Sequence, residues 1–285
     1  MLVKEHRYDG TVIRFTKGHG TENDFVIVAD PEAALAVEPG WVAAVCDRRA
    51  GIGADGVLRV VATAKMPGHE RYAGEAPWFM DYRNADGSIA EMCGNGVRVF
   101  ARYLVDQGLA DAGSFGVATR AGVKTVTVPA DGGDITVDMG VPAWPGESAR
   151  ISWDDREAES VHVDMGNPHA VVFVSDVAEA GPLYTAPRWT PEQVYPHGVN
   201  VEFVAPIGRS HIAMRVFERG SGETRSCGTG ACAAMIAAAR RDEAPAGTPY
   251  TVDVPGGRLV IVEREDGSVE MTGPAVLVAD GELRG

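Results

Sequence analysis

One pattern occurs twice in the chain, and it restricts the possible folds more than any other feature. Cys93-Gly94-Asn95-Gly96 follows residues 78–87, and Cys227-Gly228-Thr229-Gly230 follows residues 213–220. A gapless offset of 134 residues superimposes the two cysteines, the glycines beside them, and Met80 on Met214. A weaker similarity links residues 18–30 with 166–176. The simplest interpretation is an internal duplication that produces two similar lobes.

The hydrophobic pattern predicts more strands than helices. Runs rich in Val, Ile and aromatic residues are typical of strands, and they cover residues 11–16, 24–29, 78–83, 123–128, 170–175, 201–204, 212–218 and 258–262. Two helices are predicted directly after the cysteine motifs, at 95–107 and 229–241, with Gly108 as the C-cap of the first. The second helix is apolar on every side, so we expect it to be buried inside a sheet.

These segments predict an α+β protein with two structurally similar lobes. The N-terminal lobe is expected at residues 1–129 and the C-terminal lobe at 130–270, since residues 129–134 are rich in turn formers. A last strand at 275–279 is expected to rejoin the first lobe, which would then include residues 271–285. A length of 285 residues suits two domains.

Composition excludes several classes of protein. A net charge of −14 argues against general binding of nucleic acid or of anionic membranes, because both favour clustered Lys and Arg. No apolar run has the length of a membrane span, and the N-terminus lacks the apolar core of a signal peptide. Four scattered cysteines are too few for a disulfide scaffold, so a cytoplasmic protein with reduced thiols is expected.

The cysteine motifs combine a thiol with an anion site. Glycine allows a ligand to approach the backbone closely, and the first N–H groups of a helix have no partner within the helix. The same helix end favours a thiolate, so we expect the pKa of each cysteine to be lowered. A base would therefore lie beside a site for a carboxylate.

Two such half-sites match the symmetry of a stereoinversion. Removing the Cα proton of an amino acid builds charge on a carboxylate that is already negative, and fixed amide donors would stabilise it. Inversion then needs a base on one face of Cα and an acid on the other. Cys93 and Cys227, if they are opposed across one pocket, meet that need. The sequence therefore predicts an amino-acid racemase or epimerase that uses no cofactor.

Other interpretations of the cysteines fit the sequence less well. A single buried cysteine is usually an inert apolar residue, and that interpretation is kept for Cys46 and Cys232. A zinc site is disfavoured because no CxxC pair is present. Residues 228–233 also fit the dinucleotide pattern GxGxxG/A, with Asp253 at about the spacing of a ribose ligand. That pattern would indicate a nucleotide-dependent oxidoreductase, although the chain is richer in strands than such a fold requires.

With these residues in view, the sequence resembles the diaminopimelate epimerase family over nearly its whole length. Six ordered blocks carry the resemblance: residues 18–25 (GHGTENDF), 51–56 (GIGADG), 84–88 (NADGS) with 93–96 (CGNG), 165–169 (MGNPH), 198–200 (GVN), and 218–220 (ERG) with 223–224 (ET) and 227–230 (CGTG). The resemblance implies two barrel-like, mostly antiparallel sheets, each around a central helix, with the active site in the cleft between them. It also implies a homodimer.

The resemblance implies an epimerase that works without pyridoxal phosphate or a metal. It would convert LL-2,6-diaminoheptanedioate to the meso form, for lysine and peptidoglycan precursor synthesis. Cys93 and Cys227 would be the acid and base, and His169 and Glu218 would modulate their pKa values. The residues implied to bind the substrate are Asn23, Asn84, Gly94, Asn95, Asn167, Asn200, Glu218, Arg219, Gly228 and Thr229.

Side-chain chemistry suits a substrate with two amino-acid ends. Arg219 can bind a carboxylate through two hydrogen bonds, Glu218 can accept from an ammonium group, and asparagines offer neutral donors and acceptors. A proline or hydroxyproline racemase, whose substrate has one carboxylate, ranks second. A phenazine-biosynthesis-like isomerase would not need both cysteines, and a non-catalytic binding module would not need thiols.

Two further expectations follow from the motifs. Gly56 stands where many relatives have Gln, which removes one expected substrate contact. Two thiols close enough to flank one carbon are also expected to form a disulfide when the empty enzyme is oxidised, and this would stop turnover. Full activity after prolonged oxidation, with both thiols still free by mass spectrometry, would contradict the disulfide hypothesis.

Overall fold

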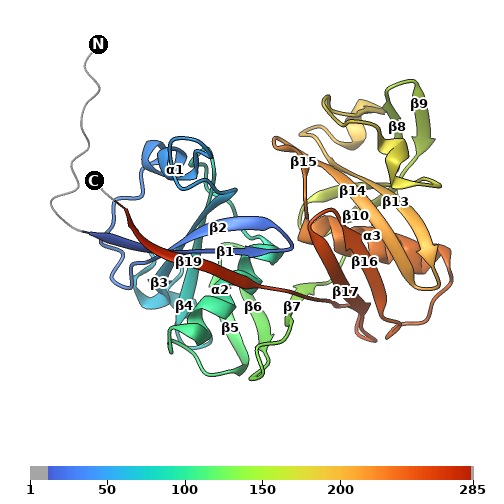
Figure 1. Ribbon diagram of the computed structural model, residues 1–285. Helices are drawn as coiled ribbons and strands as arrows, with labels where there is room; N and C mark the ends of the chain where they lie inside the picture. The colour runs from blue at the N-terminus through green and yellow to red at the C-terminus, as the bar shows by residue number, and fades with distance from the viewer. Residues whose placement is uncertain (1–11, 284–285) are drawn as a thin grey trace, which may run out of the picture.

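The computed structural model describes residues 12–283 and contains two lobes side by side (Figure 1). The blue-to-green half of the chain builds one lobe, and the yellow-to-red half builds the other except for the red strand at its end, which lies in the first lobe. The elements of the first half are β1 (Ile13–Gly20), β2 (Asn23–Ala29), α1 (Pro39–Cys46), β3 (Gly56–Ala62), β4 (Trp78–Asn84), α2 (Gly94–Asp106), β5 (Gly113–Thr119), β6 (Gly122–Val128) and β7 (Ile135–Gly140). Two short 3-10 turns, η1 (Thr63–Lys65) and η2 (Glu70–Tyr72), precede β4.

The second half continues with strands and one long helix. Its elements are β8 (Arg150–Trp153), β9 (Arg156–Glu159), β10 (Val161–Asp164), β11 (Pro168–Phe173), η3 (Val177–Ala180), β12 (Arg188–Thr190), η4 (Glu192–Val194), β13 (Asn200–Gly208), β14 (His211–Glu218), β15 (Gly222–Thr224), α3 (Gly228–Arg241), β16 (Tyr250–Val254), β17 (Gly257–Glu263), β18 (Val269–Gly273) and β19 (Val276–Leu283). β19 returns across the molecule and pairs with β1 in the first lobe (Figure 1).

The strand pairing repeats between the lobes, as a duplication requires. Within the described residues one 16-stranded sheet runs β10-β11-β13-β14-β16-β17-β18-β7-β6-β5-β4-β3-β2-β1-β19, with β15 added to β14. In the first lobe β2 pairs parallel with β3, and β4 parallel with β5. In the second lobe β11 pairs parallel with β13, and β14 parallel with β16. The other neighbours are antiparallel, so the predicted mostly antiparallel, two-lobed α+β fold is confirmed.

Each lobe wraps its strands around one helix. α2 packs on strands that include β1, β2, β6 and β7, and α3 on β10, β11, β13, β14, β16 and β17. α3 is buried along nearly its whole length, from Gly228 to Ala239, with only Thr229 partly exposed, as its all-apolar sequence predicts. α2 begins one residue before its predicted start and ends at Asp106, and Gly108 follows with φ +66°.

The predicted strands all occur, with shifted ends. The strand predicted at residues 11–16 is β1, although Thr11 lies outside the described residues. The prediction missed α1, β3, β5 and β7 of the first half and several strands of the second half. β3 was missed because Gly56–Ala62 is an almost continuous buried run with Arg59 inside it, rather than an alternating pattern. Among the described residues, no helix is long and apolar enough to cross a membrane.

Candidate active site

Each motif cysteine is the N-cap of the central helix of its lobe. The Cys93 side chain accepts a hydrogen bond from the Gly96 N–H at 3.4 Å, before α2. The Cys227 side chain accepts one from the Gly230 N–H, also at 3.4 Å, before α3. The N-cap position explains the shared spacing, because a cap residue bonds the third N–H of its helix. The amides of the two residues after each cysteine stand in the first helical turn, where no partner exists within the helix.

The two helix starts adjoin where the lobes meet. The Asn95 side-chain Nδ2 donates to the Ser226 carbonyl at 3.1 Å and to the Ser226 hydroxyl at 3.2 Å. A Cβ atom added to Gly228 would lie 3.5 Å from the Asn95 backbone nitrogen. Since Ser226 directly precedes Cys227, and Asn95 follows Cys93 by two residues, the structure brings the two cysteine motifs together.

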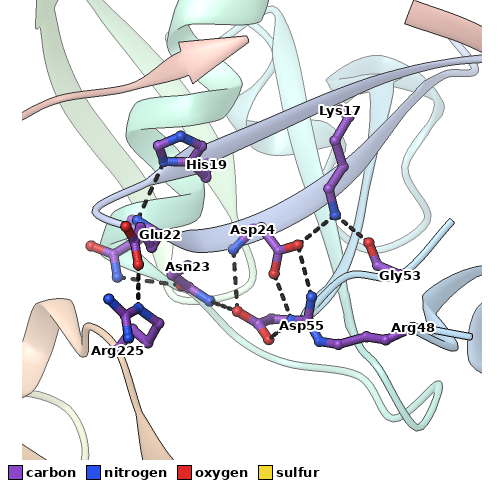
Figure 2. A network of polar contacts seen from close by, with 10 residues as sticks. Lys17, His19, Glu22, Asn23, Asp24, Arg48, Gly53, Asp55 and Arg225 are labelled. Carbon is purple, nitrogen blue, oxygen red and sulfur yellow. Dashed lines mark hydrogen bonds and ion pairs between the residues drawn. The ribbon is translucent and has the colours of Figure 1, made fainter. Parts of the chain in front are cut away.

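Asn23 connects Cys93 to this junction. Its Oδ1 accepts hydrogen bonds from the Cys93 thiol at 3.5 Å and from Asn95 Nδ2 at 3.3 Å. Its Nδ2 donates to Asp55 Oδ2 at 2.7 Å, and Figure 2 shows the Asn23 side chain directed toward that carboxylate. Asp55 therefore fixes which end of the Asn23 amide faces the thiol.

A charged cluster holds Asp55 and Asn23 in place (Figure 2). Arg48 donates to Asp24 Oδ1 at 2.7 Å and to Asp55 Oδ1 at 2.6 Å, and Lys17 bonds Asp24 at 2.5 Å. Although burial opposes ionisation, the hydrogen bonds from Arg48 and Lys17 lower the pKa of Asp24 to about 2. Asp24 therefore acts as a fixed acceptor rather than as a proton carrier.

Burial dominates the ionisation of both thiols. It raises the pKa of Cys93 to about 11, although the amide of Gly96 acts in the opposite direction. Burial likewise raises the pKa of Cys227 well above its ordinary value, and the charges of Glu218 and Glu202 add to that effect. The expectation of a lowered pKa is therefore wrong for the empty enzyme: the helix amides do favour the thiolate, but the loss of hydration outweighs them.

Asn167, Asn200 and Arg219 lie at the ends of strands of the second lobe. Asn167 Oδ1 contacts His169 Nε2 at 3.0 Å beside β11. Asn200, at the start of β13, donates to the Pro168 carbonyl at 3.1 Å and accepts from the Arg219 N–H at 3.0 Å. The pairing of β11 with β13 places His169 opposite Asn200, which explains how blocks far apart in sequence meet.

Glu218 and Arg219 differ in exposure. Glu218 accepts a hydrogen bond from the Thr224 hydroxyl, and burial raises its pKa. Arg219 is exposed, and its Nη1 donates to the His197 carbonyl at 3.2 Å. Thr229 Oγ1 lies 3.5 Å from Cys227 Sγ. Glu218 is thus a half-buried acceptor at the end of β14, and Arg219, the next residue, carries an exposed guanidinium.

Asn84 and Gly56 pair with each other across β3 and β4. The Asn84 amide is half-buried and donates to the Ser88 hydroxyl at 3.0 Å. A Cβ atom on Gly56 would lie 2.4 Å from the Arg83 carbonyl oxygen and 2.6 Å from the Tyr82 ring. The Tyr82 ring therefore fills the space that a longer side chain at position 56 would need.

Sequence reasoning missed several polar residues of the junction. Arg98 is fully buried, and its guanidinium donates to Asn95 Oδ1 at 2.9 Å and to the Thr21 hydroxyl at 3.4 Å. Thr21 Oγ1 lies 2.6 Å from Ser226 Oγ. Burial lowers the pKa of Arg98 to about 10. Its position three residues after Asn95, on the same face of a helix, was the available signal.

The structure argues against a dinucleotide site at α3. Asp253, the candidate ribose ligand, is bonded to Arg258 at 2.6 Å and to His211 at 2.9 Å. The strand directly before the motif is the short β15, which pairs antiparallel with β14. Among residues 12–283 no group of three or more His, Cys, Asp or Glu side chains is arranged to hold a metal ion.

Comparison with known proteins identifies the family. The sequence model described as diaminopimelate epimerase matches residues 15–145 and 161–278. The diaminopimelate epimerase of Streptomyces coelicolor is 62% identical over 278 residues, which cover 96% of this chain and 96% of that protein. The diaminopimelate epimerase of Thermobifida fusca is 49% identical, over 95% of this chain and 98% of that protein. The chain belongs to the diaminopimelate epimerase family.

Family membership confirms the predicted isomerase, an enzyme that epimerises the small molecule diaminopimelate in lysine biosynthesis. Two solved structures share the fold at low identity. A phenazine biosynthesis protein of the PhzF family from Bacillus anthracis has a TM-score of 0.69 at 16% identity, covering 96% of this chain and 99% of that one. A hydroxyproline epimerase from Agrobacterium vitis has a TM-score of 0.69 at 14% identity, covering 96% and 93%. These likenesses extend to the fold alone.

Proposed function

We propose that Cys93 and Cys227 perform the epimerisation as an acid and base pair. The observation that carries the proposal is the matched geometry of the two cysteines, each capping its helix through a 3.4 Å bond to the third amide. The two helix starts adjoin through Asn95 and Ser226. One thiolate takes the Cα proton of LL-2,6-diaminoheptanedioate, and the other thiol delivers a proton to the opposite face, which gives the meso form without pyridoxal phosphate.

The free amides of both helices bind the reacting carboxylate in this proposal. Gly94 and Asn95 supply donors from α2, and Gly228 and Thr229 supply them from α3. As the Cα proton leaves, negative charge spreads onto the carboxylate, and donors that are already oriented stabilise it without rearranging. Gly94 also fits closely under the core, because a Cβ there would lie 2.8 Å from the side chains of both Met139 and Met271.

The remaining polar residues bind the rest of the substrate in this proposal. Asn23 lies beside the Cys93 half-site, and Asn167, Asn200, Glu218 and Arg219 lie in the second lobe. Arg219 suits the distal carboxylate and Glu218 suits an ammonium group. Asn84, half-buried at the end of β4, is assigned to the same task. His169 and Glu218 modulate the thiols, and Glu218 is among the charges that raise the pKa of Cys227.

Substitution of single cysteines tests the catalytic assignment. We expect Cys93→Ala and Cys227→Ala to lose turnover while still binding diaminopimelate, measured by calorimetry. Wild-type protein incubated with the LL isomer in deuterium oxide should place deuterium at Cα of the meso product. Cys232→Ala is the matched control, because Cys232 is also buried in α3 but lies one turn beyond the cap. Wild-type turnover in either motif variant would reject the assignment.

We propose that the first lobe comprises residues 1–129 with 271–285, and the second lobe residues 130–270. The return of β19 to β1 supports this division. Limited proteolysis with mass spectrometry tests it, because cuts should concentrate near residues 129–134 and 271–275. Cleavage confined to other loops would count against these boundaries.

We also propose a homodimer in the cytoplasm. β19 is the last strand of the large sheet, and it exposes Val276 and Val278 at 44% and 59%. Unpaired edge strands with apolar side chains favour association with another chain. All four cysteines are free thiols, as a reducing compartment requires. Sedimentation velocity should give about twice the 30.1 kDa chain mass, and a monomer at micromolar concentration would contradict the proposal.

A further inference from the structure

The duplication allows the two half-sites to be compared position by position. The offset of 134 residues equates Tyr82 with Val216. On the neighbouring strand, Leu58 pairs with Tyr82 in the first lobe, and Glu202 pairs with Val216 in the second. Leu58 of β3 and Glu202 of β13 are therefore structural equivalents, one apolar and one a carboxylic acid.

Both residues lie against the first turn of their helix. A Cβ added to Gly96 would lie 3.5 Å from Leu58 Cδ2, and one added to Gly230 would lie 2.7 Å from Glu202 Oε1. The Gly96 and Gly230 amides are the ones that bond the cysteine sulfurs. Leu58 therefore lies against the helix start that Cys93 caps, whereas the carboxyl group of Glu202 lies against the helix start that Cys227 caps.

Glu202 is fully buried and only partly satisfied. Its Oε1 lies 2.6 Å from His169 Nδ1, and both side chains are 0% exposed. Its Oε2 makes no hydrogen bond within the described part of the chain. The equivalent of His169 on the neighbouring strand is Phe25, since Phe25 pairs with Gly56 as His169 pairs with Asn200. Burying a carboxyl group costs free energy that an apolar pair such as Phe25 and Leu58 avoids, so Glu202 is expected to serve the site.

We propose that Glu202 is a positioning residue that keeps the proton on Cys227 in the empty enzyme, so that Cys93 is the thiol that ionises first. The reason is electrostatic: a carboxylate beside the first turn of α3 disfavours a second negative charge there, and Leu58 has no such effect on Cys93. The inference rests on the proposed catalytic role of the two cysteines and adds that their thiols ionise unequally.

The charges facing each thiol agree with this inequality. Cys227 is faced by Glu202 from β13 and Glu218 from β14, and His169 from β11 reaches it through Glu202. Cys93 is faced by Glu218, and by the buried Arg98, which acts in favour of its thiolate. Burial raises the pKa of both thiols and is the largest cause in each, so the difference between them comes from these neighbouring charges.

The proton balance of one turnover follows from this resting state. The Cys93 thiolate takes the Cα proton, and the Cys227 thiol gives its proton to the other face of the carbanion. The product therefore leaves an enzyme with a neutral Cys93 and a Cys227 thiolate beside Glu202. Exchange of one proton from Cys93 to solvent and one from solvent to Cys227 restores the starting form, with no net change in charge.

Carbon-13 NMR of cysteine Cβ atoms tests the proposal without turnover. Protein labelled in its cysteines is titrated between pH 7 and 10, and single cysteine-to-alanine variants, including Cys93→Ala and Cys227→Ala, assign each signal. We expect the Cys93 signal to begin its shift toward thiolate first. In Glu202→Gln the thiolate fraction of Cys227 at a fixed alkaline pH should rise about tenfold, the effect of one pKa unit, while the Cys93 signal changes much less.

Glu263→Gln is the matched control, since Glu263 is a buried carboxylate of the same lobe that pairs with Arg240 at 2.7 Å, away from both cysteines. The double variant His169→Phe with Glu202→Leu copies the first lobe and keeps the test open if the single variant does not fold. It too should raise the thiolate fraction of Cys227. An unchanged Cys227 signal in folded variants, or equal movement of both cysteines, would overturn the proposal. Failure of the catalytic assignment would appear separately, as turnover by the cysteine-to-alanine variants.

Discussion

Replacing Gly256 with alanine is expected to disturb catalysis through the contact between the lobes. A Cβ atom on Gly256 would lie 1.9 Å from the Thr21 carbonyl oxygen, whereas real Cβ contacts are not shorter than 3.0 Å. The turn that carries Thr21 must therefore move by at least 1.1 Å, the difference between the two values. Because the crowded oxygen belongs to the backbone and a Cβ atom has no rotamer, rotation of a side chain cannot relieve the overlap.

The displaced turn holds one side of the active site. Thr21 Oγ1 lies 2.6 Å from Ser226 Oγ, and a shift of about 1 Å would lengthen this contact beyond hydrogen-bonding distance. Asn23, two residues further on, bonds the Cys93 thiol. A misplacement of about 1 Å costs roughly 100-fold in rate when reacting groups must be aligned. We therefore expect Gly256→Ala to lower kcat/KM about 100-fold, mostly through kcat, in a coupled assay of meso product formation.

The matched control for Gly256→Ala is Gly74→Ala. Gly74 has no atom within 4 Å of an added Cβ, so this variant should retain the wild-type kcat/KM. Thermal unfolding followed by circular dichroism verifies that both variants are folded at the assay temperature. Wild-type kinetics in folded Gly256→Ala would refute the argument that backbone contact between the lobes sets the geometry of the cysteines.

Three other changes give separate tests. Asp81→Asn should lower the free energy of unfolding by about 3–5 kcal/mol at pH 7 in urea, since Asp81 is fully buried among Arg59, Arg83 and Arg120. Although burial opposes it, these arginines lower the pKa of Asp81, so the difference from wild type should be complete above the ordinary value of 3.8 and shrink as the pH falls below it. Glu22→Gln breaks an exposed ion pair with Arg225 and should cost less than about 1 kcal/mol in the same assay. Because burial raises the pKa of Cys93 to about 11, kcat/KM should increase from pH 7 to pH 9, and a flat profile over that range would contradict a thiolate base.

The duplicated motif predicted the central geometry because it is local. Cys-Gly-Xaa-Gly before an apolar run specifies an N-cap, a helix start and unpaired amides, all within six residues. The structure has Cys93 and Cys227 at both N-caps. The lowered thiol pKa was the error, since it was argued from the helix end alone. Burial depends on the surrounding strands, and a motif says nothing about how deeply its cysteine is covered.

Residues whose role depends on strand register could not be predicted from local sequence patterns. Glu202 sits in a run of buried residues where a carboxylate has no periodic signal, and its meaning comes from its pairing with Val216 and its contact with the α3 start. Arg98 and Ser226 were missed for a similar reason. Ser226 accepts from Asn95 across the junction between the lobes, and Arg98 donates to Thr21, which lies in a distant segment of the chain.

An enzyme that inverts a stereocentre has to be symmetric in position and asymmetric in charge. The reaction needs a donor and an acceptor at equal reach from Cα, and duplication of a capped helix provides that reach. In two identical half-sites the two thiols would have the same pKa, so the form with one thiol and one thiolate would have no preferred arrangement. In the second lobe His169 and Glu202 take the places of Phe25 and Leu58, which changes the charge beside the start of α3. The distance from the cysteine sulfur to the third amide of its helix is nevertheless 3.4 Å in both lobes. The second lobe therefore keeps the shape of the first and differs where a proton has to be held.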